Sequence, residues 1–221
     1  SKERAEFRIL MFGDSLTGTV TANYEWVDTV EELLNAKKPL RAAVKGHEFR
    51  VYNLGVVAAG FSSFWKYYEQ VGARLDADLI VVNFIDDDYR RRDNAPRFTE
   101  EEQEGMASHA ADILQRLQRT GIPVVVTQLP MYYELVPKRV EFPVTTALQT
   151  KLPDLPIVDM RQHLPLDLGP AYVRRWYSLP YDHHFSDYGG ELYARAMAKV
   201  IAAHLDKNGR DVVARVIYGF R

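Results

Sequence analysis

Short apolar runs alternate with longer amphipathic stretches along most of the chain, and this alternation is the strongest constraint on its fold. Five runs are typical of buried strands, at residues 7–12, 49–53, 79–85, 122–127 and 156–159. Parallel strands joined by helices need right-handed crossovers, which place helices on both faces of one sheet. The sequence therefore predicts an α/β fold, a single-domain three-layer α/β/α sandwich around a five-stranded parallel sheet.

Helices are expected between these strands, at residues 24–35, 61–75, 99–119, 144–151 and 188–205. The start of the third is marked by a capping box, because Thr99 can accept a hydrogen bond from the third backbone N–H while Glu102 reaches back. Gly121 is expected to end it. Either Ser186 or Asp187 is expected to cap the last helix.

Length and composition exclude several classes of protein. The chain of 221 residues is 47% apolar, which predicts one domain over 1–221 with a core at about 7–206 and a C-terminal tail at 207–221. The absence of cysteine excludes a disulfide scaffold, a thiolate metal site and a cysteine nucleophile. A formal charge of −2 argues against nucleic acid as a partner held by a basic field.

The sequence gives little information on location. No apolar run approaches the roughly 20 residues that span a bilayer. The opening residues are too polar for a secretion signal, and the chain begins without Met. The compartment is left open, with the cell envelope or secretion as the expectation if an upstream leader or anchor has been removed. The oligomeric state is also left open.

The first candidate for chemistry is the segment Gly13-Asp14-Ser15-Leu16-Thr17-Gly18, directly after the first strand. A glycine at the strand exit allows a sharp turn, which lifts the next side chains above the carboxyl edge of the sheet. Ser15 then presents its hydroxyl at the start of a helical segment, where free N–H groups favour a developing anion. The alternative is an ordinary strand-to-helix turn in which Ser15 caps the helix.

The second candidate is the segment from Tyr181 to Gly189, just ahead of the last helix. A serine nucleophile needs a general base, and an imidazole needs an acceptor that fixes its tautomer. Residues two apart in an extended loop point the same way, so Asp182 can bind the Nδ1–H of His184 and leave Nε2 facing Ser15. The alternatives are a surface histidine pair or a metal cluster that includes His183. The prediction is that no metal and no cofactor take part.

These two segments together resemble a known family. Phe12-Gly13-Asp14-Ser15-Leu16-Thr17 is similar to block I of the SGNH/GDSL hydrolase superfamily, and Asp182-His183-His184-Phe185-Ser186 is similar to its C-terminal block. The resemblance implies a flavodoxin-like SGNH hydrolase fold. It also implies that Ser15 is the nucleophile, His184 the base and acid, and Asp182 its orienting partner.

The resemblance also implies an oxyanion hole built from the nucleophile's N–H, a glycine N–H and an asparagine side chain. The glycine block is similar to residues 53–62, where Gly60 is the choice because it precedes a helix and Gly55 is the alternative. At the asparagine position the chain has Asp87, and the usual glycine before it is missing. Asn83 is a poor replacement because it lies inside the strand.

Asp87 leaves three accounts open. An ionised carboxylate cannot donate a hydrogen bond to an oxyanion and would repel it. The site can run on two backbone donors with a third supplied elsewhere, or neighbouring Asp86 and Asp88 can keep Asp87 protonated. The third account is a weakened, non-catalytic or engineered relative.

The predicted function is a serine hydrolase of the esterase type that forms an acyl-enzyme on Ser15. Family resemblance suggests a small-molecule or glycan ester as substrate, with an acetyl group as the guess. Asp14, Arg90 and Arg91 are the candidate substrate-binding residues, the last two on an arginine-rich loop suited to anions. The alternatives are an O-acyltransferase that uses the same three residues and a catalytically weakened glycan-binding or assembly module.

Overall fold

The computed structural model describes residues 5–18, 25–85, 99–135, 143–180 and 182–207. Five parallel strands form one sheet in the order β2-β1-β3-β4-β5. They are β1 (Glu6–Gly13), β2 (Glu48–Gly55), β3 (Leu79–Phe84), β4 (Val124–Gln128) and β5 (Ile157–Asp159). This order is the flavodoxin-like one, in which the connections change direction between β1 and β3 and open a crevice at the carboxyl ends of the strands.

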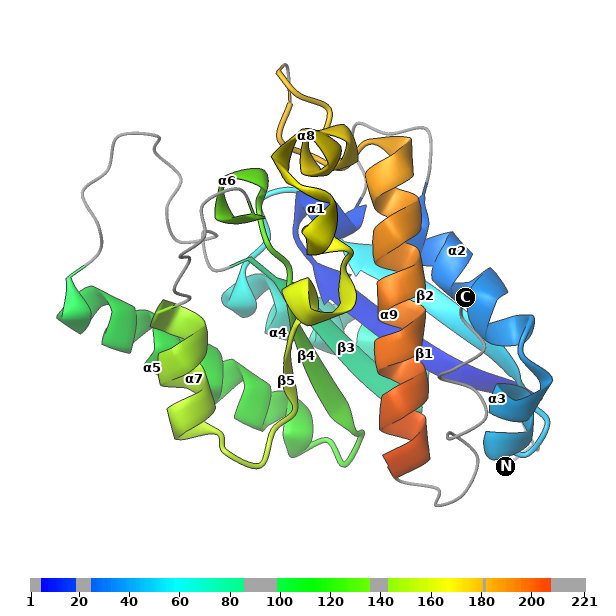
Figure 1. Ribbon diagram of the computed structural model, residues 1–221. Helices are drawn as coiled ribbons and strands as arrows, with labels where there is room; N and C mark the ends of the chain where they lie inside the picture. Colours follow the sequence, from blue (N-terminus) through cyan, green and yellow to red (C-terminus); the bar gives the residue numbers. More distant parts are fainter. Residues whose placement is uncertain (1–4, 19–24, 86–98, 136–142, 181, 208–221) are drawn as a thin grey trace.

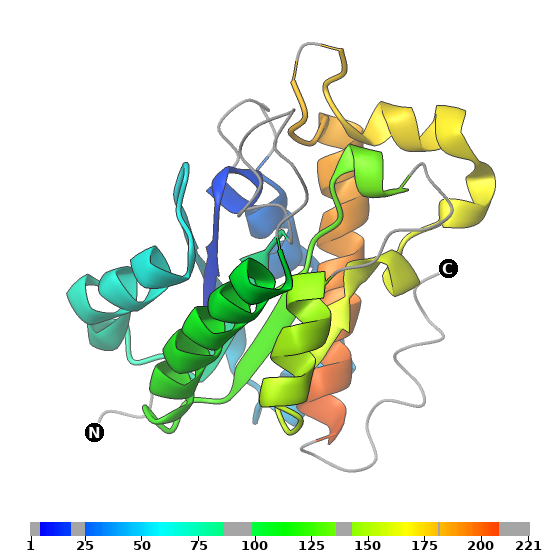
Figure 2. The ribbon, with the colours of Figure 1, turned by 90° about the vertical axis from the view of Figure 1, so that its left-hand side faces the viewer.

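Helices cover both faces of the sheet, so the predicted three-layer sandwich is confirmed (Figures 1 and 2). One face carries α2 (Trp26–Asn35), α3 (Lys38–Ala43) and α9 (Asp187–Lys207). The other carries α4 (Phe61–Gln70), α5 (Glu100–Gln118) and α7 (Pro143–Lys151). Each face has its own buried apolar cluster.

Alternation within β1 divides its side chains between these two clusters. Ile9 and Met11 pack with the α2 and α9 side, while Leu10 and Phe12 pack with the α4 and α5 side. All four are fully buried. A strand covered on both faces is largely apolar, which is why residues 9–12 of β1 and 79–82 of β3 form continuous hydrophobic runs.

The expected helix boundaries are right at some ends and wrong at others. The capping box at Thr99 forms, and Gly121 follows α5 with a φ of +81°. The helix expected at 61–75 ends at Gln70 and is followed by the 3-10 turn η1 (Gly72–Arg74). Val71 leaves the helical conformation there, with φ −128° and ψ −55°.

Short elements complete the described part of the chain. They are α1 (Ser15–Gly18), α6 (Tyr132–Leu135), η3 (Met160–His163), η4 (Leu166–Leu168), α8 (Pro170–Val173) and η5 (Arg174–Trp176). Both α6 and α8 lie beyond the carboxyl edge of the sheet (Figures 1 and 2). Among the described residues, none of the helices combines the length and the apolar character that a membrane span requires.

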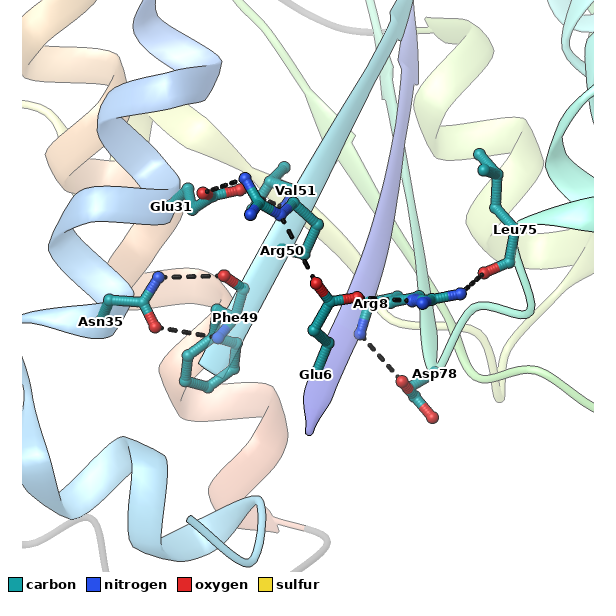
Figure 3. A network of polar contacts seen from close by, with 9 residues as sticks. All are labelled: Glu6, Arg8, Glu31, Asn35, Phe49, Arg50, Val51, Leu75 and Asp78. Atoms are coloured by element: carbon teal, nitrogen blue, oxygen red, sulfur yellow. Dashed lines mark hydrogen bonds and ion pairs between the residues drawn. The ribbon is translucent and has the colours of Figure 1, made fainter. Parts of the chain in front are cut away.

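Side chains of α2 form hydrogen bonds with backbone groups of β2, an edge strand of the sheet (Figure 3). The Asn35 amide donates to the Phe49 carbonyl at 2.9 Å and accepts from the Phe49 N–H at 2.8 Å. Glu31 accepts from the Val51 N–H at 2.7 Å and from the Arg50 guanidinium at 3.0 Å. The side chains of α2 thus satisfy backbone groups that would otherwise be open to pairing with another strand.

Candidate active site

The turn that carries Ser15 is tightly built at the end of β1. A side chain on Gly13 would place its Cβ 2.0 Å from the Thr17 Oγ1, so only glycine fits there. The Asp14 carboxylate is buried and accepts a hydrogen bond from the Leu16 N–H at 2.8 Å. Ser15 is the first residue of α1, where the backbone N–H has no partner within the helix.

The loop that carries Asp182 and His184 is fixed at both of its ends. The Ser178 N–H donates to the His184 carbonyl at 2.9 Å, and Tyr177 pairs with Phe185 in an antiparallel bridge. At the far end Ser186 caps α9, since its Oγ accepts from the Gly189 N–H at 3.1 Å.

Gly189 allows α9 to pack against the segment before this loop. A Cβ on Gly189 would lie 1.9 Å from the carbonyl oxygen of Trp176. The same carbonyl accepts from the Ser186 N–H at 2.8 Å. The close approach therefore anchors the start of α9, and with it the loop that it follows.

The structure brings the three residues of the predicted triad together from opposite ends of the chain. The His184 Nε2 lies 2.7 Å from the Ser15 Oγ. The His184 Nδ1 is hydrogen-bonded to the Asp182 carboxylate, which also accepts from the His184 N–H at 3.0 Å. A carboxylate on Nδ1 fixes the tautomer in which Nε2 can accept the serine proton.

The ionisation state of Asp182 suits an acceptor for the His184 Nδ1–H. Partial burial raises the pKa of the Asp182 carboxyl, but the hydrogen bonds from the His184 side chain and backbone outweigh it and leave the pKa below its usual value. Asp182 is therefore ionised at neutral pH. An ionised acceptor holds the imidazole in place and stabilises the imidazolium that would form when Ser15 loses its proton.

The two glycines that were candidates for the oxyanion hole have different surroundings in the structure. Gly55 has a packing role, because its Cβ would lie 2.3 Å from the Gly18 nitrogen and its N–H already donates to Asn53 at 2.9 Å. Gly60 caps α4 and has open space where a Cβ would point. Within the described residues, neither the Gly60 N–H nor the Ser15 N–H has a hydrogen-bond partner.

A buried network under the nucleophile turn was missed by the reasoning from sequence. Thr127 on β4 donates to the Asn83 Oδ1 at 2.5 Å, and the Asn83 Nδ2 donates to the Thr17 Oγ1 at 3.3 Å. On the other side, the Asn53 amide donates to the Thr17 carbonyl at 3.1 Å. Thr17, Asn83 and Thr127 are almost fully buried. The signal was an asparagine within an otherwise apolar strand.

The remaining predicted site residues have different outcomes. Asp87, Arg90 and Arg91 lie outside the described residues, so their parts stay predictions. Asp14 holds the turn through its bond to Leu16, and its contact with substrate also stays a prediction. Within the described residues, no group of three or more His, Cys, Asp or Glu side chains is placed to hold a metal ion.

Known structures share this fold at low sequence identity. An acetyl xylan esterase, AlAXEase, superposes with a TM-score of 0.66 at 15% identity over 88% of this chain and 100% of that one. A catalytic mutant of Axe2, an acetylxylan esterase from Geobacillus stearothermophilus, superposes with a TM-score of 0.65 at 17% identity, covering 88% and 94%. The chain has the fold of these esterases.

A larger esterase matches over part of its length. The two-domain esterase CEX, active on acetylated mannans, superposes with a TM-score of 0.61 at 15% identity. The match covers 91% of this chain, and the chain spans 50% of that protein. The sequence matches no protein-family model and no curated protein sequence.

Proposed function

We propose that the protein is a serine esterase of the SGNH/GDSL type that cleaves a carboxylic ester through an acyl-enzyme on Ser15. The observation that carries the proposal is the 2.7 Å contact between the Ser15 Oγ and the His184 Nε2, with Asp182 on the opposite ring nitrogen. Nucleophile, base and orienting carboxylate are the parts that acyl transfer requires.

The proposed reaction runs in two halves. In the first, the His184 Nε2 takes the Ser15 proton while the Oγ attacks the ester carbonyl, and the tetrahedral intermediate collapses as the alcohol leaves with that proton. In the second, His184 takes a proton from water, the resulting hydroxide attacks the acyl-enzyme, and the carboxylic acid leaves as Ser15 regains its proton. Asp182 stays ionised throughout and holds the imidazole.

The proposed oxyanion hole uses two backbone donors, the N–H groups of Ser15 and Gly60. Their lack of other partners in the described part of the chain supports this assignment. A missing side-chain donor typically costs about 2.7–4 kcal/mol of transition-state stabilisation. Because Asp87 takes the place of the family's asparagine, we expect turnover to be slower than in a site with three donors.

The substrate class proposed is an acetyl ester on a carbohydrate. Several proteins that share the fold are esterases of acetylated xylan or mannan, and this similarity supports the class without naming the sugar. The test is hydrolysis of 4-nitrophenyl acetate by the wild type and by Ser15→Ala. We expect Ser15→Ala to lower kcat by roughly 10⁴-fold or more. Undiminished turnover by Ser15→Ala would exclude Ser15 as the nucleophile.

A further inference from the structure

A cavity of about 710 Å³ borders the loop that carries Asp182 and His184. Its described lining residues come from α6, from η5 and from the segment that leads into that loop. Of these elements, α6 lies beyond the carboxyl edge of the sheet (Figures 1 and 2). Its walls include Tyr132, Arg174, Arg175, Tyr177 and His183. His183 is the chain neighbour of His184, and consecutive Cα atoms are about 3.8 Å apart. A ligand in this cavity would therefore contact the loop that carries His184.

The two arginines of the cavity are held by aromatic rings. The Arg174 guanidinium lies 6.0 Å from the centre of the Tyr132 ring, and its Nε donates to the Tyr132 hydroxyl at 3.0 Å. The Arg175 guanidinium lies 5.2 Å from the Tyr188 ring. Both arginines are exposed, and these contacts favour one position for each cation without neutralising its charge.

The cavity is cationic because no described carboxylate pairs with either arginine. No Asp or Glu is among its described lining residues, and neither arginine takes part in an ion pair within the described segments. Two arginines elsewhere are paired, Arg161 with Asp159 at 2.6 Å and Arg195 with Glu191 at 2.6 Å. The free donors of a guanidinium match the geometry of a carboxylate.

Aromatic side chains of the cavity add a second kind of recognition. The rings of Tyr132 and Tyr177 meet edge to face, with centroids 6.0 Å apart. Tyr177 is buried, and its hydroxyl donates to the Pro130 carbonyl at 2.7 Å, so this ring is rigidly placed. Rigid aromatic surface next to fixed cations suits a ligand that has both an apolar ring face and a negative charge.

We infer that this cavity is a subsite for a sugar ring that bears a carboxylate, so that the substrate is an acetyl ester on an acidic glycan. The assignment of the cavity as a substrate subsite rests on the proposed esterase function. A uronate ring is the class that combines both features of the cavity. It offers a face for the tyrosines and a carboxylate for Arg174 and Arg175.

The test is binding of trigalacturonate, which has no ester to cleave, measured by calorimetry on the wild-type protein. We expect trigalacturonate to bind and neutral xylotriose to bind at least roughly tenfold more weakly. Arg174→Gln and Arg175→Gln should each weaken trigalacturonate roughly tenfold, while Arg195→Gln on the outer face of α9 should leave it unchanged. Thermal unfolding of each variant checks that it is folded.

Three results would contradict the inference. Equal binding of the two trisaccharides, or equal binding of trigalacturonate by wild type and both cavity variants, would overturn the inference. So would binding of inorganic sulfate without binding of trigalacturonate, because the cavity would then be an anion site with no sugar. Hydrolysis of 4-nitrophenyl acetate by the wild type tests the esterase separately, since that ester carries neither a sugar nor a carboxylate.

Discussion

Two serine–histidine pairs with the same separation occur in the described part of the protein, and they differ in what surrounds them. The His184 Nε2 lies 2.7 Å from the Ser15 Oγ, and the His109 Nε2 lies 2.7 Å from the Ser62 Oγ. The first pair follows β1 at the switch point of the sheet. The second joins α4 to α5, and both of its side chains are exposed.

The two pairs differ in whether a carboxylate binds the histidine and in what lies below the serine. Asp182 binds the Nδ1 of His184, whereas no described carboxylate hydrogen-bonds to His109. Ser15 starts a turn that Asn83 supports from below, whereas Ser62 lies on an exposed helix surface. We therefore expect Ser62–His109 to be inactive, so this pair provides an internal control for each test of Ser15–His184.

The largest difference is expected between the two histidines. His184→Ala removes the proposed general base and should lower kcat for 4-nitrophenyl acetate by roughly 10⁴- to 10⁶-fold. His109→Ala should leave kcat within about twofold, because exposed polar contacts of this kind contribute little. Steady-state kinetics on both variants make the comparison. Equal losses would show that the carboxylate does not distinguish the pairs.

Removing the charge of Asp182 should have the next largest effect. Asp182→Asn keeps the shape but favours the wrong tautomer of His184, so kcat should fall by roughly 10³- to 10⁴-fold. The folded-state pKa of Asp182 lies below the unfolded value of about 4, so ionisation stabilises the fold above that pH. That contribution is lost as the pH falls through the lowered pKa.

Stability measurements at several pH values test the same charge without turnover. Wild type should be more stable than Asp182→Asn at pH 7, and the gap should shrink as the pH falls from about 4, the unfolded pKa, through the lowered folded pKa. Urea unfolding of the two proteins at each pH gives the difference. A gap that stays constant across this range would mean that Asp182 is not an ionised partner of His184.

A substitution of Asn83 tests whether the buried network supports the turn that carries Ser15. Asn83→Leu leaves the buried hydroxyls of Thr17 and Thr127 without their amide partner, which should cost about 1–3 kcal/mol of stability. A shifted turn should also lower kcat by roughly 10- to 100-fold. The double variant with Thr127→Val should cost less than the sum of the two single changes. Strict additivity would argue against a coupled network.

The smallest effect is expected on β2, an edge strand of the sheet. Arg50 pairs with Glu31 at 3.0 Å, and 52% of its side chain is exposed (Figure 3). Arg50→Gln should change the free energy of unfolding by about 1 kcal/mol or less and leave kcat unchanged, because water screens exposed ion pairs. A loss as large as that of Asn83→Leu would remove the contrast between the buried network and this exposed ion pair.

Much of the fold can be predicted from sequence because β1 and β3 are covered on both faces and are apolar over most of their length. The break after Gln70 could not be predicted, since helical spacing continues across Val71. Within the site, Ser15 and His184 stand in two short segments whose local patterns carry the chemistry. The two segments lie near opposite ends of the sequence, and the fold brings both to the carboxyl edge of the sheet.

The rest of the site depends on contacts between distant residues. The network through Asn83 requires that β3 and β4 pair with Asn83 opposite Thr127, and nothing in either strand alone specifies that register. The sequence favours Gly60 because it precedes a helix, but the close approach of Gly55 to Gly18, which gives Gly55 a packing role, is not visible there. The cationic cavity joins Tyr132 to residues some forty positions later.

The most direct measurement of the central claim is covalent labelling with a fluorophosphonate, followed by intact-mass analysis and peptide mapping. The reagent traps a serine only when a base removes its proton and donors stabilise the negative charge that forms. We expect one adduct per chain, on Ser15, with labelling lost in Ser15→Ala and kept in Ser62→Ala. A wild-type protein that stays unlabelled, or an adduct on Ser62, would contradict the account.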